Sequence, residues 1–410
     1  MTRKRLTVVA AAVTLAAGGI AAGLAMAGSP VPPPALPALV AVPGPFRSAG
    51  TAAAADPGFN GVSCTSAAAC TVVGSAKAPD GRTVPLAERW DGHAWVVEAT
   101  QAPPGGGSLQ SVSCVSARAC TAVGYARTGP RADQMLPLAE SWHGGEWVPQ
   151  AAVVRGAADD LTDVSCPAAT FCMALGGRLH PDGSSTTLME RWDGHRWTQL
   201  ATPAGRDMAS VSCSAATSCV AVGSDTADDF GVWSEAWDGS TWGIQANGDV
   251  STGELAGAVS CPSPGACTVV GSSYFYDLSP TAERWDGARW RIEDAVEPSD
   301  ADTDGDGLVA VSCVSASACV AVGSYSDVEL PDDNSETLAE KWNGSAWAIL
   351  PTPRFTGTEG TLSDISCTSA RACLAVGETD DQQAAAGRTE NRPLVERWNG
   401  RAWTVLAIRT

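Results

Sequence analysis

Short apolar segments, each closed by a glycine or by an Asp-Gly or Asn-Gly pair, follow one another from about residue 59 to the end of the chain. Typical segments are "VSCTSAAACTVVG" at 62–74 and "LAERWDGHAW" at 86–95, and no helical period appears between them. The first predicts the end of one strand, a five-residue loop and a second strand that ends at Gly74. The second predicts a hairpin, because the turn at Asp91 and Gly92 needs a positive φ, which glycine adopts without steric cost.

Both segments recur seven times, and this repetition decides the predicted architecture. The first cysteines of successive copies are 47 to 54 residues apart. A period of this length without helices indicates four-stranded blades repeated around an axis. The sequence therefore predicts an all-β fold, namely a seven-bladed β-propeller of four-stranded antiparallel blades over residues 59–410.

The repeated Glu and Trp residues are expected to pack the blades together. Whether the hairpin loop has two residues or four, Glu88, Trp90 and Trp95 lie on the same face of the sheet. In a ring of blades that face meets the neighbouring blade, and an aromatic pair in each blade fills the space between sheets. Because these residues and Gly92 stand in every copy, we assign them a structural role.

The repeat resembles the kelch type found in the central domain of galactose oxidase, here in a secreted bacterial form with C-x5-C in each blade. The matching features are a glycine that closes the second strand, a Glu two residues before an aromatic residue, and a Trp that opens the fourth strand. The chain departs in having a single glycine instead of a pair, Trp instead of Tyr, and two cysteines per blade. The resemblance implies the fold and no particular activity, since kelch modules bind many ligands and a few are enzymes.

The copper site of galactose oxidase is not matched by this chain. It requires two His and two Tyr, one of them cross-linked to Cys. Here His93, His143 and His195 all fall in the turn between the third and fourth strands. The cysteines are also expected to be paired with one another.

All 14 cysteines occur as C-x5-C pairs around the loop between the first two strands. Because the chain begins with a leader, local disulfides are expected. Zinc ligation is the alternative, but no His recurs near the pairs and zinc sites favour closer spacing. The expected disulfides are Cys64–Cys70, Cys114–Cys120, Cys166–Cys172, Cys213–Cys219, Cys261–Cys267, Cys313–Cys319 and Cys367–Cys373.

Residues 1–27 have the features of a secretory signal peptide. A basic start precedes an uncharged run from Leu6 to Ala27, which ends in an A-x-A cleavage pattern at Ala25. The run is also long enough to span a bilayer, so an uncleaved N-terminal anchor is the alternative and would be the one contact with a membrane. Residues 28–58 are a Pro/Ala-rich linker. We therefore expect a secreted protein, located outside the cell or at the cell envelope.

The loops at the two ends of the strands differ in how much they vary between copies. The first-to-second and third-to-fourth connections keep constant lengths and share one side, the constant face. The other two connections carry the insertions and share the variable face, where propellers bind partners.

Aromatic residues that break the repeat gather on the variable face, and we predict one patch that stacks on sugar rings or captures a peptide. The alternative is that they fill the bases of their loops. They are Tyr125, Trp233, Tyr274, Phe275, Tyr276 and Tyr325.

The segment "SDADTDGDGLV" at 299–309 is a candidate calcium site. Its alternating carboxylates before Gly305 match the start of a D-x-D-x-D-G loop, as in EF-hands and integrin-type propellers. Leu308 and Val311 stand where closing ligands are expected. Without a metal the segment is a solvated acidic loop. The candidate Ca²⁺ ligands are Asp300, Asp302, Asp304 and, as a substitute, Asp306; no other cofactor is indicated.

The net charge of −19 disfavours nucleic-acid binding, because an acidic surface repels phosphates. We predict a monomeric, non-catalytic binding module whose ligand is an extracellular protein or a glycan on the variable face. The alternative is an extracellular carbohydrate-active hydrolase or lyase that uses loop carboxylates as acid and base. The sequence assigns no catalytic residue.

Overall fold

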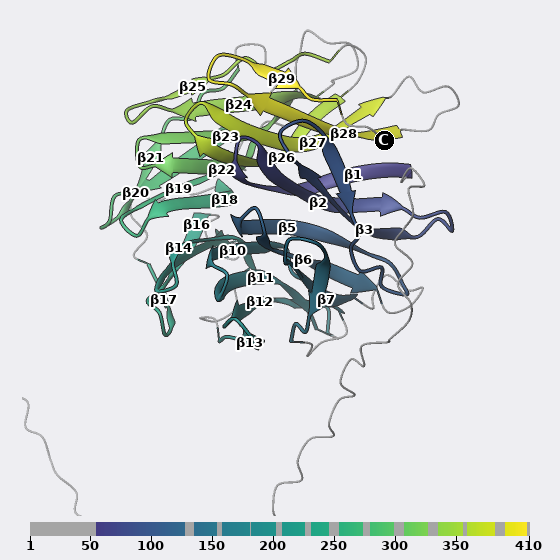
Figure 1. The fold of residues 1–410 in the computed structure, drawn as a ribbon. Coiled ribbons are helices and arrows are strands. Elements are labelled where there is room, and N and C mark those ends of the chain that lie inside the picture. Colours follow the sequence, from purple (N-terminus) through teal and green to yellow (C-terminus); the bar gives the residue numbers. More distant parts are fainter. Residues whose placement is uncertain are drawn as a thin grey trace, which may run out of the picture. The chain divides into compact units, whose positions relative to one another are not determined.

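The computed structural model describes residues 55–127, 135–153, 158–180, 182–201, 207–225, 231–245, 254–273, 279–298, 307–326, 335–355, 359–381 and 390–407. These residues all belong to the compact unit Phe46–Thr410. Within them every regular element is a β-strand, in agreement with the all-β prediction (Figure 1). The strands form five four-stranded antiparallel sheets and one nine-stranded sheet.

The strands are grouped below by the sequence repeat to which they belong. Repeat 1 contains β1 (Ala55–Ser66), β2 (Ala69–Lys77), β3 (Thr83–Trp90) and β4 (Trp95–Glu98). Repeat 2 contains β5 (Gly107–Ser116), β6 (Ala119–Arg127), β7 (Met135–Trp142) and β8 (Trp147–Gln150). The short strand β9 (Ala158–Asp159) precedes repeat 3, which contains β10 (Asp163–Ala168), β11 (Phe171–Leu179), β12 (Ser185–Trp192) and β13 (Trp197–Gln199). Repeat 4 contains β14 (Asp207–Ala215), β15 (Ser218–Asp225), β16 (Gly231–Trp237) and β17 (Trp242–Ile244).

The remaining repeats have the same order. Repeat 5 contains β18 (Glu254–Ser263), β19 (Ala266–Ser273), β20 (Pro280–Trp285) and β21 (Trp290–Glu293). Repeat 6 contains β22 (Gly307–Ser315), β23 (Ala318–Ser326), β24 (Ser335–Trp342) and β25 (Trp347–Ile349). Repeat 7 contains β26 (Glu359–Ser369), β27 (Ala372–Asp381), β28 (Glu390–Trp398) and β29 (Trp403–Val405).

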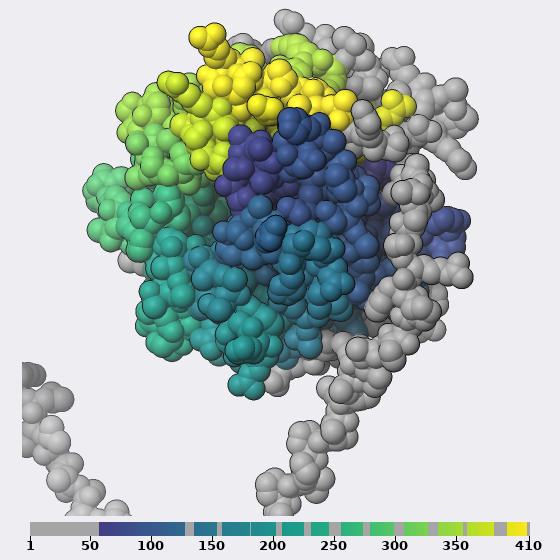
Figure 2. All heavy atoms as spheres, in the orientation of Figure 1, coloured from purple at the N-terminus to yellow at the C-terminus, as the bar shows by residue number. Residues whose placement is uncertain are grey.

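The first strands of successive repeats contact one another in a closed cycle. The cycle runs through β1, β5, β10, β14, β18, β22 and β26 and returns from β26 to β1 (Figure 1). The apolar core lies between neighbouring sheets, because each core cluster joins residues of two successive repeats. One such cluster packs Val62 and Val72 of repeat 1 against Val376 and Val395 of repeat 7. Figure 2 shows the corresponding contact on the surface, where the yellow C-terminal part lies directly against the purple N-terminal part.

Repeats 2 and 3 share the nine-stranded sheet because β9 lies between them. This strand pairs in parallel with β7 and antiparallel with β11. Its Asp159 is fully buried and accepts two bonds from the Arg178 guanidinium, at 3.1 and 3.0 Å. The pairing of β9 departs from the repeat, and it links the two repeats on the variable face.

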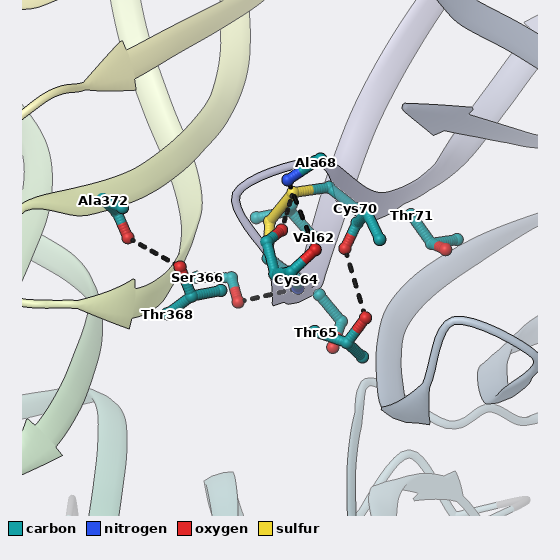
Figure 3. Close-up of a disulfide and its surroundings, with 12 residues drawn as sticks. Val62, Cys64, Thr65, Ala68, Cys70, Thr71, Ser366, Thr368 and Ala372 are labelled. Carbon is teal, nitrogen blue, oxygen red and sulfur yellow. Dashed lines mark hydrogen bonds between the residues drawn. A yellow bond between two sulfur atoms is a disulfide. The ribbon is translucent and has the colours of Figure 1, made fainter. Parts of the chain in front are cut away.

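The repeated V-S-C motif, which is I-S-C in repeat 7, is explained by bonds between first strands. In each repeat the serine hydroxyl oxygen accepts the backbone N–H of the first cysteine in the next repeat, at 2.9 or 3.0 Å. The acceptor serines are Ser63, Ser113, Ser165, Ser212, Ser260, Ser312 and Ser366. The last of these bonds joins Ser366 to Cys64 and closes the cycle (Figure 3).

The predicted hairpin and disulfides are confirmed. Trp90 lies directly opposite Trp95, with ring centroids 5.4 Å apart, so the loop has four residues and Glu88 shares their face. Gly92 has φ of 96°, and Asp91 Oδ1 accepts the N–H groups of His93 and Ala94 at 2.8 and 2.9 Å. All seven C-x5-C pairs form disulfides, and no free cysteine remains among the described residues.

The glycine that closes the second strand is required by a close approach of the first strand. A Cβ at Gly74 would lie 1.9 Å from the carbonyl oxygen of Gly58, which is far inside contact distance. The first strand shifts register beside this position, so its backbone is pushed toward the glycine. The equivalent Gly124, Gly176, Gly223, Gly323 and Gly377 face the same obstruction at 1.9 to 2.1 Å.

Candidate functional site

A hollow of about 310 Å³ lies beside β24 and β25 in repeat 6. Its wall includes Tyr325 at the end of β23, Glu336 in β24, and the loop residues Pro298 and Arg354. Glu336 is 2% exposed, and its Oε2 accepts the N–H of Phe355 at 3.3 Å. The loop residues belong to fourth-to-first connections, so this repeat 6 hollow lies on the variable face.

The described members of the predicted aromatic patch lie in three different repeats. Tyr325 is 8% exposed and belongs to the core between repeats 5 and 6 while it also lines the hollow. Trp233 in β16 is half-buried, packs against the core between repeats 3 and 4, and donates from Nε1 to Glu235 Oε1 at 3.4 Å. Tyr125 in β6 is half-buried beneath the guanidinium of Arg127, 5.6 Å from the ring centroid. The structure therefore does not bring these three rings together.

The other predicted site residues lie outside the described residues. They are Tyr274, Phe275 and Tyr276 of the aromatic patch and Asp300, Asp302, Asp304 and Asp306 of the calcium loop. Within the described ranges, no three His, Cys, Asp or Glu side chains are grouped so that they could hold a metal ion. The same ranges contain no helix that is long and apolar enough to cross a membrane.

A second and larger space, the repeat 2–3 cleft, has a volume of about 390 Å³ and lies between those two repeats. Its walls include Ser141 and His143 of repeat 2 and Trp192, His195 and Arg196 of repeat 3. These side chains lie at or beside the third-to-fourth-strand turns, so the cleft lies toward the constant face. Sequence reasoning placed function on the variable face and missed this cleft.

A signal for the cleft was present in the sequence. Six copies of the hairpin segment keep Asp or Asn before the turn glycine, whereas repeat 2 reads "LAESWHGGEW" and has His143 there. The same copy has Ser141 where five others have Arg or Lys. His143 Nε2 and Ser141 Oγ are 2.9 Å apart, so the two departures from the repeat form one local arrangement.

The repeated glutamate of the third strand binds the connection that arrives from the preceding repeat. Glu140 is fully buried, and its carboxylate oxygens accept the N–H of Gln101 at 3.2 and 3.4 Å. Gln101 stands six residues after Trp95. Equivalent bonds join Glu190 to Val153 and Glu340 to Val296. In these three repeats the glutamate thus holds successive repeats together. A structural role for the equivalent Glu88, which is 5% exposed, stays a prediction.

Burial shifts the titration of these glutamates. It raises the pKa of Glu140 and Glu396 to about 8, and that of Glu88, Glu190 and Glu340 to about 7. The cause is desolvation, which disfavours the charged carboxylate more than the backbone N–H bonds favour it. Perturbed pKa values are often found at active sites. Here the carboxyls are at most 5% exposed and sealed between sheets, so the shift reflects packing.

Two aspartates tie the first strands together at equivalent positions. Asp163 in β10 accepts the hydroxyls of Ser111 and Ser210, both at 2.9 Å, and so joins repeats 2, 3 and 4. Asp364 in β26 accepts the N–H of Val62 at 2.7 Å and joins repeats 7 and 1. Burial raises the pKa of Asp364 to about 7, and the charge of Asp163 adds to this shift. Both carboxyls are occupied by these contacts, which indicates a structural role.

The chain is similar to several solved structures at low sequence identity. A GH74 xyloglucanase from Xanthomonas campestris is 15% identical, with a TM-score of 0.51, and the match covers 85% of this chain and 55% of that one. YCF48 from Cyanidioschyzon merolae is 12% identical, with a TM-score of 0.48 and coverage of 78% and 93%. An ulvan lyase of family PL25 is 10% identical, with a TM-score of 0.48 and coverage of 87% and 99%. The chain matches no protein-family model, and no curated protein is similar to it in sequence.

The domain is a β-propeller. Five of its sheets are four-stranded and antiparallel, and the sixth joins repeats 2 and 3 through β9. Neighbouring repeats pack face to face, and their first strands form a closed cycle. The similarity to the xyloglucanase concerns this fold alone, since the chain spans about half the length of that enzyme at low identity. In this propeller the repeat 6 hollow and the repeat 2–3 cleft are the candidate binding sites.

Proposed function

We propose that the protein is a secreted, seven-bladed propeller of kelch-like type that binds an extracellular protein or glycan through its variable face. The count of seven blades is supported by the seven hairpin copies and the seven serine-to-cysteine bonds, if β5–β8 and β10–β13 are taken as separate blades joined by β9. Location outside the cell is supported by the leader-like residues 1–27 and by the seven disulfides, since disulfides persist in oxidising compartments.

The observation that carries the binding proposal is the repeat 6 hollow. At about 310 Å³ it falls in the range of about 300–1,000 Å³ typical of ligand sites. It combines the aromatic Tyr325 with the polar Glu336 and the exposed Arg354, a mixture suited to a sugar or a peptide.

The predicted calcium loop stands beside this hollow in the sequence. Asp300 is two positions after Pro298, which lines the hollow, and the loop runs on to β22 of the same repeat. We propose that Ca²⁺, held by Asp300, Asp302, Asp304 and Asp306, orders this border of the site. Tyr274, Phe275 and Tyr276 of repeat 5 are proposed as further ligand contacts, since the second-to-third connection of each repeat opens on the variable face.

Binding is tested on the purified mature chain with a glycan array and with a panel of extracellular peptides. Arg354→Ala should weaken a ligand that binds in the hollow by about tenfold or more, because it removes an exposed charged contact at the rim. Arg401→Ala is the matched control, since Arg401 is an exposed arginine in a third-to-fourth-strand turn on the constant face. A ligand whose affinity is changed by Arg401→Ala and unchanged by Arg354→Ala would contradict this location.

An enzymatic role has one observation in its favour. Glu336 lines the hollow, and its charge is among the causes that raise the pKa of Glu396 to about 8. Glu396 is fully buried and accepts the hydroxyl of Thr337 at 3.3 Å, so its carboxyl is sealed from a substrate in the hollow. Only Glu336 of these two glutamates can reach a ligand in the hollow, which favours binding over acid–base catalysis by a pair of carboxyls. Release of reducing or unsaturated ends from any bound polysaccharide, lost in Glu336→Gln, would favour the hydrolase or lyase alternative.

A further inference from the structure

An arginine on the third strand often contacts the tryptophan of the next repeat. The guanidinium carbon of Arg89 lies 4.8 Å from the ring centroid of Trp142, and its Nη2 donates to the carbonyl oxygen of Ala117 at 2.7 Å. Equivalent contacts join Arg284 to Trp342 and Ala316. A cation over an indole face, completed by a backbone carbonyl of the first loop, is thus a repeated contact between blades.

The third-strand tryptophan of a repeat is less exposed where the preceding repeat places a half-buried cation beside it. Where the preceding repeat supplies a half-buried Arg or Lys, the tryptophan is 2% to 5% exposed. These pairs are Arg89 with Trp142, Arg191 with Trp237, Arg284 with Trp342, and Lys341 with Trp398. Where the preceding repeat supplies a small side chain or an exposed arginine, the tryptophan is half-buried. These pairs are Ser141 with Trp192, Ala236 with Trp285, and Arg397 with Trp90.

The repeat 2–3 cleft includes the position that this arginine would occupy, because Ser141 lines it. Between repeats 7 and 1, where Arg397 is exposed and Trp90 is half-buried, the equivalent walls enclose only about 20 Å³, so a partly exposed tryptophan does not by itself open a cleft. Between repeats 2 and 3, where Ser141 replaces the arginine, the volume is about 390 Å³. In repeats 1 and 5 an acid accompanies the arginine, namely Glu98 and Glu293, whereas repeat 2 has Gln150 at this position. Gln150 instead accepts the indole N–H of Trp197 at 3.0 Å.

We propose that the repeat 2–3 cleft binds the guanidinium of an arginine side chain on a partner polypeptide. The cation lies over the exposed part of Trp192 and donates to the carbonyl oxygen of Ala169, the equivalent of Ala117 in repeat 2. The indole N–H of Trp192 already reaches that oxygen at 3.3 Å, and a carbonyl oxygen has a second lone pair to offer. The partner thereby reproduces, between molecules, a contact that other repeats make within the chain.

Several features favour a peptide arginine over other ligands. A guanidinium is planar, stacks on an aromatic face and donates several bonds, whereas a lysine ammonium is a strongly hydrated point charge. The cleft is larger than one guanidinium, so the residues that flank the arginine can enter it and meet His143 and Gln150. Arg196 also lines the cleft, but its charge is offset by Asp193 at 3.6 Å. The net charge of −19 attracts basic peptides at long range.

Calorimetry with blocked Gly-Arg-Gly and Gly-Lys-Gly peptides tests this proposal on the purified chain. We expect the arginine peptide to bind at least about tenfold more tightly than the lysine peptide. Ser141→Arg should reduce arginine-peptide binding by at least about tenfold, because the new side chain fills the cleft and stacks on Trp192. Trp192→Leu should have the same effect on binding. Ala236→Arg, the same change at the equivalent position of repeat 4, is the control and should leave binding to the repeat 2–3 cleft intact.

Thermal unfolding accompanies these measurements, because Ser141→Arg should keep or raise the melting temperature if it restores the repeated contact. Unchanged peptide affinity in a folded Ser141→Arg variant would overturn the proposal, as would equal affinity for the two peptides. If free arginine bound as tightly as the peptide, the proposal that the partner is a polypeptide would be wrong. The guanidinium assignment would also be wrong if a neutral glycan bound to the natural sequence and not to Ser141→Arg, while the arginine peptide bound to neither.

Discussion

The hydroxyl oxygen of Ser366 accepts the backbone N–H of Cys64 at 2.9 Å, and this bond joins the last repeat to the first across 302 residues (Figure 3). No peptide segment connects the two repeats at this point, so side-chain and backbone contacts alone keep the ring closed. Asp364 adds a second bond, to the N–H of Val62 at 2.7 Å.

Ser366→Ala is therefore expected to lower the free energy of unfolding by about 1–2 kcal/mol, because the N–H of Cys64 loses its acceptor. Urea unfolding measures this change. Ser345→Ala is the control, since Ser345 lies in an exposed hairpin turn and should change the free energy by less than about 0.5 kcal/mol. Equal effects of the two substitutions would contradict a role for Ser366 in closing the ring.

Gly74→Ala should be strongly destabilising, by about 2 kcal/mol or more, because the new Cβ would lie 1.9 Å from a backbone carbonyl oxygen that cannot move independently. Differential scanning calorimetry of the purified variant gives the change in melting temperature. Gly145→Ala offers a matched substitution, as a Cβ added there would meet no atom within 4 Å. Its melting temperature should stay close to that of the natural sequence.

The stability of the protein should fall as the pH rises from about 5 to 8. Burial raises the pKa of Glu140 to about 8 and of Glu190 to about 7, from an ordinary value of 4.5. The folded state therefore binds more protons than the unfolded state in this window, and the stabilisation by the neutral carboxyls is lost as pH passes the folded pKa values. Urea midpoints at pH 5 and pH 8 measure the effect.

Glu140→Gln isolates the contribution of one carboxyl to this pH dependence. A neutral side chain of the same shape does not titrate, so the variant should lose less stability than the natural sequence between pH 5 and pH 8. The exposed Glu297 provides the control, and Glu297→Gln should keep the original pH dependence. A variant at Glu140 with an unaltered pH dependence would show that this carboxyl does not titrate in the window.

Arg89→Ser should expose Trp142 between repeats 1 and 2, as Trp192 is partly exposed between repeats 2 and 3. Loss of the contact with Trp142 and of the bond to Ala117 should lower the free energy of unfolding by about 1–2 kcal/mol. Acrylamide quenching should also increase, because Trp142 becomes accessible. Arg401→Ser, at an exposed turn, should change neither quantity.

Much of the fold follows from local patterns that repeat. The turn at Gly92, the shared face of Trp90 and Trp95 and the C-x5-C disulfides depend on residues within about ten positions of one another, so spacing was enough to predict them. The direct pairing of Trp90 with Trp95 was one of two registers that the sequence allowed. Repetition also separated the structural Glu88 from a catalytic acid. The pairing of β9 with both β7 and β11 had no such signal, because it joins segments of different repeats.

The candidate sites were predicted less well, because they depend on contacts between repeats. Sequence placed Tyr325 on the variable face but could not show that its ring is largely buried beside a hollow. It likewise could not show that Trp233 and Tyr125 pack in separate repeats.

The sequence by itself determined the all-β architecture, the four-stranded repeat and the disulfides, because strand, turn and cysteine chemistry act over short distances along the chain. Only the tertiary structure decided which tryptophans stay partly exposed and where the cleft and the hollow lie. Ser141 and Trp192 are about 50 residues apart, and they line the same space from two neighbouring blades. Packing between blades, which the sequence signals only through departures from the repeat such as Ser141 and His143, therefore sets the location of the candidate binding sites.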